Sequence, residues 1–209
     1  MKQLHRPDLY GWSVFDESRN MDFNSVLWVR RDTSGKPANV AVDPLPLSKH
    51  DFEHLQSLGG LGTIVITNSD HVRDAVTIRQ ATGATLCGPA AERATFPVPC
   101  DKWLSAGEQP VGGLVTYTVE GGKTPGELAL LLEQTTLITG DLIRSHAGGR
   151  LDSLPAPKLA NVRLVIDSLR QLLRIDTLSA VLPGDGWPAF YGARRLLEEL
   201  LSRVELEAN

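Results

Sequence analysis

The sequence lacks several patterns that mark whole classes of protein. Only two cysteines occur, Cys87 and Cys100, and they do not have the C-x-x-C spacing of a redox or zinc pair. We expect both to be free thiols, as is usual in a reducing compartment. The formal charge is −4 and the basic residues are scattered, so nothing in the sequence favours binding to nucleic acid or to an anionic membrane.

Long apolar runs are also missing. No stretch approaches the ~18 apolar residues that a membrane span needs, and residues 1–8 lack the apolar core of a secretory signal. We therefore expect a cytoplasmic protein. The chain has 209 residues, of which 42% are hydrophobic and 22% charged, and this suits a single domain over residues 1–209 with a sizeable core.

The apolar residues that are present predict an alternation of strands and helices. The expected strands cover residues 12–15, 25–30, 39–43, 63–66, 84–87, 114–119, 127–132, 136–139 and 180–182. Helical spacing is expected at residues 48–58, 72–83, 162–173 and in a terminal segment from about residue 190. The two long helices carry a single apolar stripe, which must lie on a sheet. This order predicts an α/β (α+β) fold with two facing sheets and outer helices, a four-layer αββα sandwich.

Polar residues gather in four loops that follow apolar strands, where α/β folds place their chemistry. The first loop ends in Asp70 and His71. The second holds Lys123 in Gly-Gly-Lys-Thr-Pro-Gly, the third ends at Asp141 in Leu-Ile-Thr-Gly-Asp, and the fourth holds Asp185 in Leu-Pro-Gly-Asp-Gly. Each loop alone also fits a structural role. Asp70 would then be a helix N-cap and His71 a solvated residue of the first helical turn.

Taken together and in this order, the four loops resemble those of the metallo-β-lactamase superfamily, whose first loop reads His-x-His-x-Asp-His. The resemblance covers essentially the whole chain. Ile66 and Asn68 stand at the first two histidines of that motif, and Lys123 stands at the histidine before Thr-Pro-Gly. Asp185 replaces the histidine that follows the last Pro-Gly.

The resemblance implies a reduced metal site. The position that three histidines would form has no usable ligand set here, because it consists of Ile66, Asn68 and Lys123. The ligands implied for the second position are Asp70, His71, Asp141 and Asp185. Three carboxylates and one imidazole can hold one divalent ion and favour Mn²⁺, Fe²⁺ or Mg²⁺ over a tight zinc site, although Zn²⁺ also binds such groups.

We expect the protein to act on or bind a small molecule, and two functions remain open. The first is a single-metal hydrolase, in which metal-bound hydroxide attacks an ester, thioester, lactone or amide and Asp70 positions or deprotonates the water. The second is a metal-free pseudoenzyme, in which Lys123 pairs with Asp141 or Asp185 and the crevice binds a small ligand or a protein partner. In both, Lys123 balances the charge of the clustered carboxylates, and it could also polarise a substrate oxygen.

Two further expectations concern the periphery of the site and the assembly. His146 lies in a glycine-rich loop after the third motif and could supply a ligand or part of a lid, or simply lie on the surface. An exposed strand edge or the apolar Trp12 and Trp28 would support a homodimer.

Overall fold

The computed structural model describes residues 1–208 and contains two main sheets. The first sheet has seven strands in the order β1-β2-β3-β4-β5-β6-β7. Their bounds are Lys2–Gln3, Leu9–Asp16, Met21–Trp28, Val40–Val42, Thr63–Val65, Thr85–Pro89 and Lys102–Leu104. Pairing is antiparallel from β1 to β4 and parallel from β4 to β7. The first sheet therefore begins with an antiparallel meander, and parallel crossovers follow it.

The second sheet has four strands in the order β13-β10-β9-β8. Their bounds are Leu114–Val119 for β8, Glu127–Leu132 for β9, Thr136–Thr139 for β10 and Ala180–Pro183 for β13. A short ribbon pairs β11 (Ile143–Arg144) with β12 (Asp152–Ser153). Strand β9 is antiparallel to both β8 and β10, and β13 is parallel to β10. Strands β8, β10 and β13 therefore end at the same edge of this sheet.

Within residues 1–208 there are four α-helices: α1 (Lys49–Ser57), α2 (Ala75–Thr82), α3 (Val162–Leu172) and α4 (Ala193–Glu207). Three short 3-10 helices, η1, η2 and η3, cover Ser69–His71, Ala90–Glu92 and Ala156–Lys158. Helix α1 begins after its N-cap Ser48, whose side chain accepts a hydrogen bond from the Asp51 N–H. Helix α2 ends at Gly83, whose left-handed conformation is common at this position. Both boundaries agree with the sequence pattern.

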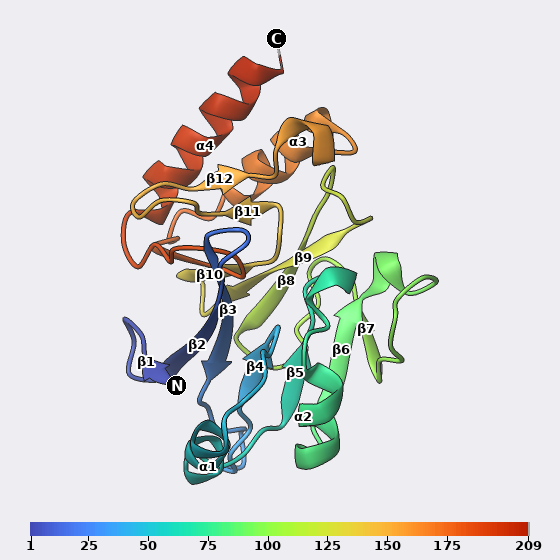
Figure 1. Ribbon diagram of the computed structural model, residues 1–209, viewed down its shortest axis with the longest axis vertical. Coiled ribbons are helices and arrows are strands. Elements are labelled where there is room, and N and C mark those ends of the chain that lie inside the picture. The colour runs from blue at the N-terminus through green and yellow to red at the C-terminus, as the bar shows by residue number, and fades with distance from the viewer. Residues whose placement is uncertain (209) are drawn as a thin grey trace.

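Helices cover the outer faces of the two sheets, which confirms the predicted αββα sandwich (Figure 1). Strand β9 shows how the layers form, because both of its faces are buried. Leu128, Leu130 and Leu132 lie in the apolar cluster between the sheets. Ala129 and Leu131 lie in the cluster beneath α3 and α4. One apolar strand thus contributes to two cores, which explains why its sequence is a continuous apolar run.

The sequence patterns missed the shortest elements. Strands β1, β7, β11 and β12 have two or three residues each, too few to show a hydrophobic period. The helix expected from residue 72 begins at Ala75, because η1 forms a separate turn before it. Cys87 and Cys100 are free thiols, as predicted. In residues 1–208 no helix has the length and apolarity to cross a membrane. The single-domain boundary at 1–209 stays a prediction, and Asn209 lies outside the described residues.

Candidate metal centre

Loops from both sheets meet at one edge of the sandwich. Strands β4 and β5 of the first sheet run parallel, as do β10 and β13 of the second. A polar residue follows the carboxyl end of each: Asp43 after β4, His71 after β5, Asp141 after β10 and Asp185 after β13. The β8–β9 loop at this edge carries Lys123. The topology thus brings together residues up to 142 positions apart in the chain, from Asp43 to Asp185.

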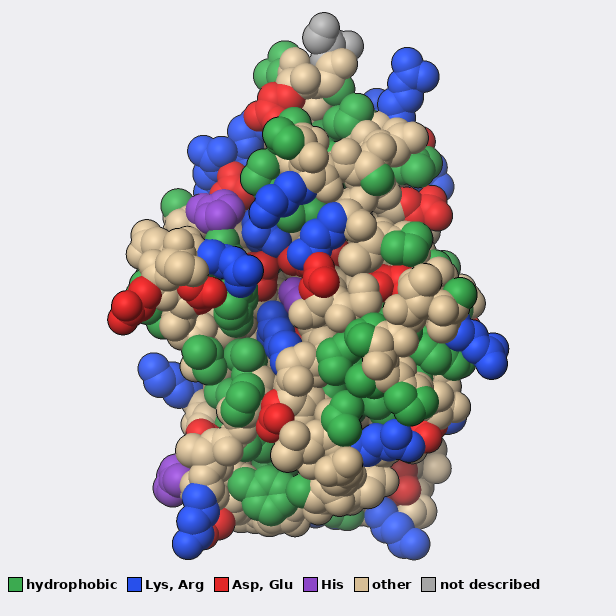
Figure 2. Space-filling view, turned by 45° about the vertical axis from the view of Figure 1, so that its right-hand side comes forward, with side chains coloured by type: hydrophobic (Ala, Val, Ile, Leu, Met, Phe, Trp, Pro, Cys, Tyr) green, Lys and Arg blue, Asp and Glu red, His purple; other side chains and the backbone are tan. Residues whose placement is uncertain are grey.

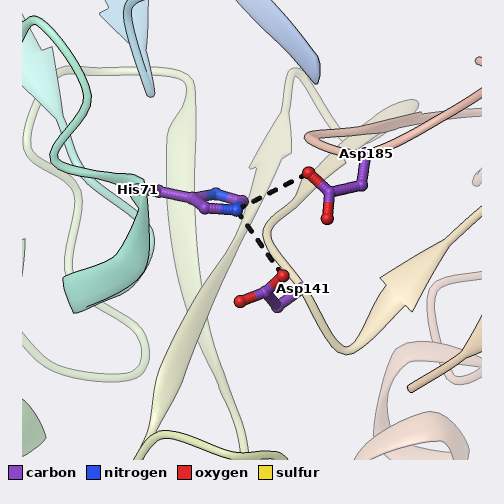
Figure 3. A group of neighbouring side chains, drawn as sticks. All are labelled: His71, Asp141 and Asp185. Atoms are coloured by element: carbon purple, nitrogen blue, oxygen red, sulfur yellow. Dashed lines mark ion pairs between the residues drawn. The ribbon is translucent and has the colours of Figure 1, made fainter. Parts of the chain in front are cut away.

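His71, Asp141 and Asp185 form a buried group at this edge (Figure 3). Nε2 of His71 lies 3.6 Å from Oδ1 of Asp141 and 3.8 Å from Oδ1 of Asp185. The edge of the imidazole faces both carboxylates, which extend from loops of the second sheet (Figure 3). Each residue offers one ligand atom, and these atoms lie within 4.8 Å of one another. The three residues can therefore hold one metal ion.

The geometry of this group suits a metal ion better than a hydrogen-bond network. The separations of 3.6 and 3.8 Å are too long for hydrogen bonds. Atoms that share one ion at about 2.1 Å are roughly 3 to 4 Å apart. Oδ1 of Asp185 is buried and has no hydrogen-bond partner among residues 1–208, and Nη2 of Arg73 lies 3.5 Å away from it. A buried carboxylate oxygen without a partner is costly, and a bound ion would satisfy it.

Asp43 orients the imidazole of His71. Oδ2 of Asp43 lies 2.8 Å from Nδ1 of His71, and the Thr67 side chain and backbone N–H both donate to the Asp43 carboxylate. A carboxylate on one ring nitrogen fixes the ring and leaves the other nitrogen free for a metal. Asp43 also has a positive φ of 46°, which is uncommon for a residue other than glycine and is often found at functional sites. The sequence pattern did not indicate this role.

His71 is not a solvated residue of a helical turn, since only 4% of it is exposed. The N-cap alternative for Asp70 is also wrong, because the side chain of Asn68 caps η1 by accepting the Asp70 N–H. Burial alone would lower the pKa of His71, but the charge of Asp43 and the interaction with Asp141 outweigh it and raise the pKa to about 10. Without metal the ring is therefore protonated near neutral pH, and an ion must displace that proton to bind.

We expect Asp43→Asn to weaken divalent-metal binding by roughly 10- to 100-fold, because an amide no longer fixes the ring of His71 in the same way. Competition with a chromophoric chelator measures the affinity. Asp32→Asn makes the same chemical change in an exposed turn and should leave the affinity unchanged. Equal affinities for wild type and Asp43→Asn would contradict the orienting role of this carboxylate.

Two cations contact the acidic side chains directly. Nζ of Lys123 lies 2.9 Å from Oδ2 of Asp141 and 2.5 Å from Oδ2 of Asp70. Nη2 of Arg144 bridges the second-sheet carboxylates, at 2.7 Å from Oδ1 of Asp141 and 2.9 Å from Oδ2 of Asp185. Burial would lower the pKa of Lys123, but its bonds to the two aspartates raise it, so the side chain is a cation. Arg144 was not predicted, although it stands three residues after Asp141.

Asp70 lies apart from the other three predicted ligands. Its side chain is 53% exposed, and it pairs with Lys123 at the rim of the crevice. Neighbouring residues of a 3-10 turn point in different directions, about 120° apart, so the burial of His71 leaves Asp70 turned outward. Its role as a ligand or a catalytic group stays a prediction, as does the catalytic role of Lys123.

The residues at the three-histidine position all have other contacts. Ile66 is completely buried in an apolar cluster behind β5, and Lys123 is paired as described. The side-chain amide of Asn68 lies 3.3 Å from the buried carboxyl group of Glu127, whose other oxygen accepts the Asp141 N–H at 2.7 Å. Burial, together with the charge of Asp141, raises the pKa of Glu127 to about 8. Glu127 went unpredicted, although a charged residue at the start of an apolar strand was a visible signal.

A cavity of about 600 Å³ opens above the His71, Asp141 and Asp185 group. In the space-filling view, Lys and Arg side chains surround a hollow that contains acidic side chains and a histidine (Figure 2). His146 contributes to the lining and is exposed, so it lies at the mouth rather than among the buried ligands. Its role as a ligand or lid stays a prediction.

Comparisons with known proteins agree with this architecture. Residues 1–204 match a family model described as the metallo-beta-lactamase superfamily. The chain belongs to this superfamily. This match confirms the resemblance seen in the four loops. The positions at which this chain differs from the family's ligand motif are read from its own sequence. No curated protein matches the chain.

Solved structures of the superfamily share the fold at low sequence identity. The DIM-1 metallo-beta-lactamase aligns with a TM-score of 0.75 and 18% identity, covering 98% of this chain and 96% of that chain. A metallo-beta-lactamase family protein from Thermus thermophilus aligns with a TM-score of 0.69 and 19% identity, covering 97% of this chain and 82% of that chain. TTHA1623 in a di-iron-bound form has a TM-score of 0.58 and 20% identity, covering 85% of this chain and 93% of that chain.

Proposed function

We propose that the protein is a hydrolase with a single-metal centre formed by His71, Asp141 and Asp185. The observation that carries this proposal is a buried imidazole whose Nε2 faces two carboxylate oxygens at 3.6 and 3.8 Å, beyond hydrogen-bond distance. Membership of the superfamily supports metal-dependent hydrolysis, and the di-iron-bound structure of TTHA1623 supports metal binding on this fold. One imidazole and two carboxylates suit Mn²⁺, Fe²⁺ or Zn²⁺.

A bound divalent ion supplies Lewis acidity and lowers the pKa of a coordinated water. The protein's own residues hold the reacting groups in place around it. Arg144 keeps Asp141 and Asp185 together, because one guanidinium nitrogen donates to both carboxylates. The contacts of Ile66 and Asn68 in the fold support one ion rather than two.

Asp70 and Lys123 are the acid–base groups that we assign to the rim. The half-exposed carboxylate of Asp70 faces the cavity and can accept a proton from water, while Lys123 restrains it by a 2.5 Å ion pair. The ammonium group of Lys123 can also donate to a carbonyl oxygen of the substrate. An ester, thioester, lactone or amide of a small molecule is consistent with this chemistry.

Metal content tests the proposal. We expect protein dialysed separately against Mn²⁺, anaerobic Fe²⁺ and Zn²⁺ to retain about one equivalent of at least one ion, as measured by plasma mass spectrometry. A chelator should remove the ion and abolish hydrolysis of a nitrophenyl ester, and adding the ion back should restore it. Retention of less than roughly a tenth of an equivalent with all three ions would contradict the proposal.

A metal-free pseudoenzyme is the second candidate, favoured by the direct contact of Lys123 and Arg144 with Asp141. In this state His71 keeps its proton, and the crevice binds a small ligand or a protein partner. The same measurement of metal content separates the two candidates. A homodimer stays a prediction under either function.

A further inference from the structure

The acidic residues of the cavity are paired with basic residues of the same cavity. Three lining residues are acidic, namely Asp70, Asp141 and Asp185. Each has a cationic partner within 3 Å, either Lys123 or Arg144. These two cations are therefore already paired with carboxylates. Other basic groups must account for any attraction of the cavity for anionic ligands.

The mouth of the cavity carries cations with weak or no acidic partners. Lys158, at the end of η3, is exposed and forms no ion pair within residues 1–208. Arg19, in the β2–β3 turn, is 65% exposed and lies 3.4 Å from Asp16, a surface pair of little strength. The Arg19 guanidinium also stacks 5.3 Å from the ring centroid of Phe23, which itself lines the cavity. This contact holds the Arg19 guanidinium beside the cavity, which Arg19 also lines.

The positive charge is a local property of this cavity. The whole chain has a formal charge of −4, yet five lining residues are Lys or Arg and only three are Asp. A divalent ion bound below would add further positive charge. A concave surface with an excess of one charge concentrates the field and attracts ligands of the opposite charge.

We infer that the crevice takes a small anionic substrate, whose carboxylate or phosphate group is held at the mouth by Arg19 and Lys158. The inference rests on the proposed hydrolase function, to which it adds the substrate class. The bond to be cleaved would lie over the buried ligand group. The cavity volume of about 600 Å³ suits a small molecule rather than a polymer.

Anion binding tests the inference without any need for hydrolysis. Succinate and inorganic phosphate are titrated by calorimetry, at low ionic strength, into metal-free and metal-loaded protein, and we expect at least one of them to bind. The double variant Arg19→Gln/Lys158→Gln should bind about tenfold more weakly. Lys36→Gln/Lys49→Gln removes the same charge from exposed positions outside the cavity and should bind like wild type. The two titrations identify which anion the mouth prefers.

A hydrolytic assay on the metal-loaded protein provides the second measurement. Wild type should prefer the anionic mono-4-nitrophenyl succinate over neutral 4-nitrophenyl acetate, and the mouth variant should lose about tenfold of this preference, mainly through KM. Equal losses in the mouth and control variants, or no anion binding by wild type, would overturn the inference. Anion binding that depends on the mouth in a protein unable to retain metal would contradict the hydrolase function alone.

Discussion

Replacement of His71 by Ala is expected to leave the protein unable to retain a divalent ion. His71 provides the one imidazole among the three grouped ligands, and the two remaining carboxylates already contact Arg144. Loss of a nitrogen ligand from a three-residue site should lower the affinity on the order of 1,000-fold. Metal content after dialysis, compared with wild type, measures the effect.

His50→Ala is the matched control, because it removes an exposed imidazole from α1. It should retain metal like wild type. The His71 variant also leaves Asp43 without one of its partners, so circular dichroism must show that the fold persists; Thr67 still donates two hydrogen bonds to that carboxylate. Equal metal content in the His71 variant and wild type would place the ion elsewhere. No metal in either protein would favour the pseudoenzyme.

The long elements of the fold were predictable because burial of one face gives their sequence a periodic pattern of apolar residues. Helix α3 begins at Val162 after its N-cap Asn161, and it places Val165, Leu169 and Leu172 in the core beneath it. The ribbon of β11 and β12 has no such pattern, since each strand has only two residues. It pairs Ile143 with Ser153 and Arg144 with Asp152, across a loop that carries no hydrophobic period.

The part of the site that could be predicted consists of residues in motifs that follow a strand. His71, Asp141 and Asp185 all follow buried strands, and the fold brings them together. Asp43 was not predicted as their partner because it acts across 28 residues of sequence, through a turn whose role appears only when β4 and β5 pair. Asp70 was grouped with the ligands because it stands at the aspartate of the family motif, next to His71, but neighbouring residues of a 3-10 turn point in different directions.

The glycines of the motifs have a steric role that the sequence does not disclose. A Cβ atom on Gly184 would lie 2.8 Å from Cε1 of His71, and one on Gly140 would lie 2.6 Å from Oγ1 of Thr67. Both contacts are closer than packed atoms tolerate. The Thr-Gly-Asp and Pro-Gly-Asp loops thus need glycine because the first-sheet loop packs directly against their backbones.

Gly186→Ala is expected to destabilise the protein by about 3–5 kcal/mol, combining backbone strain with overpacking. Gly186 has a φ of 90°, and a Cβ there would lie 1.7 Å from the backbone oxygen of Ser145. Its N–H donates to the Asp22 carbonyl at 2.7 Å, and its own carbonyl accepts from Nδ2 of Asn24 at 2.6 Å. The added methyl group must therefore displace the loop that presents Asp185, or separate it from β3.

Urea unfolding followed by circular dichroism measures this loss, and failure of the variant to fold would agree with it. Gly148→Ala is the control, because no atom lies within 4 Å of the added Cβ and the φ of Gly148 is not positive. We expect its unfolding free energy to stay within about 0.5 kcal/mol of wild type. A Gly186 variant that lost less than about 1 kcal/mol would mean that the Asp185 loop can move away from Ser145 at little cost. In that case the position of Asp185 beside His71 would not be held by the fold, and metal binding would have to order it.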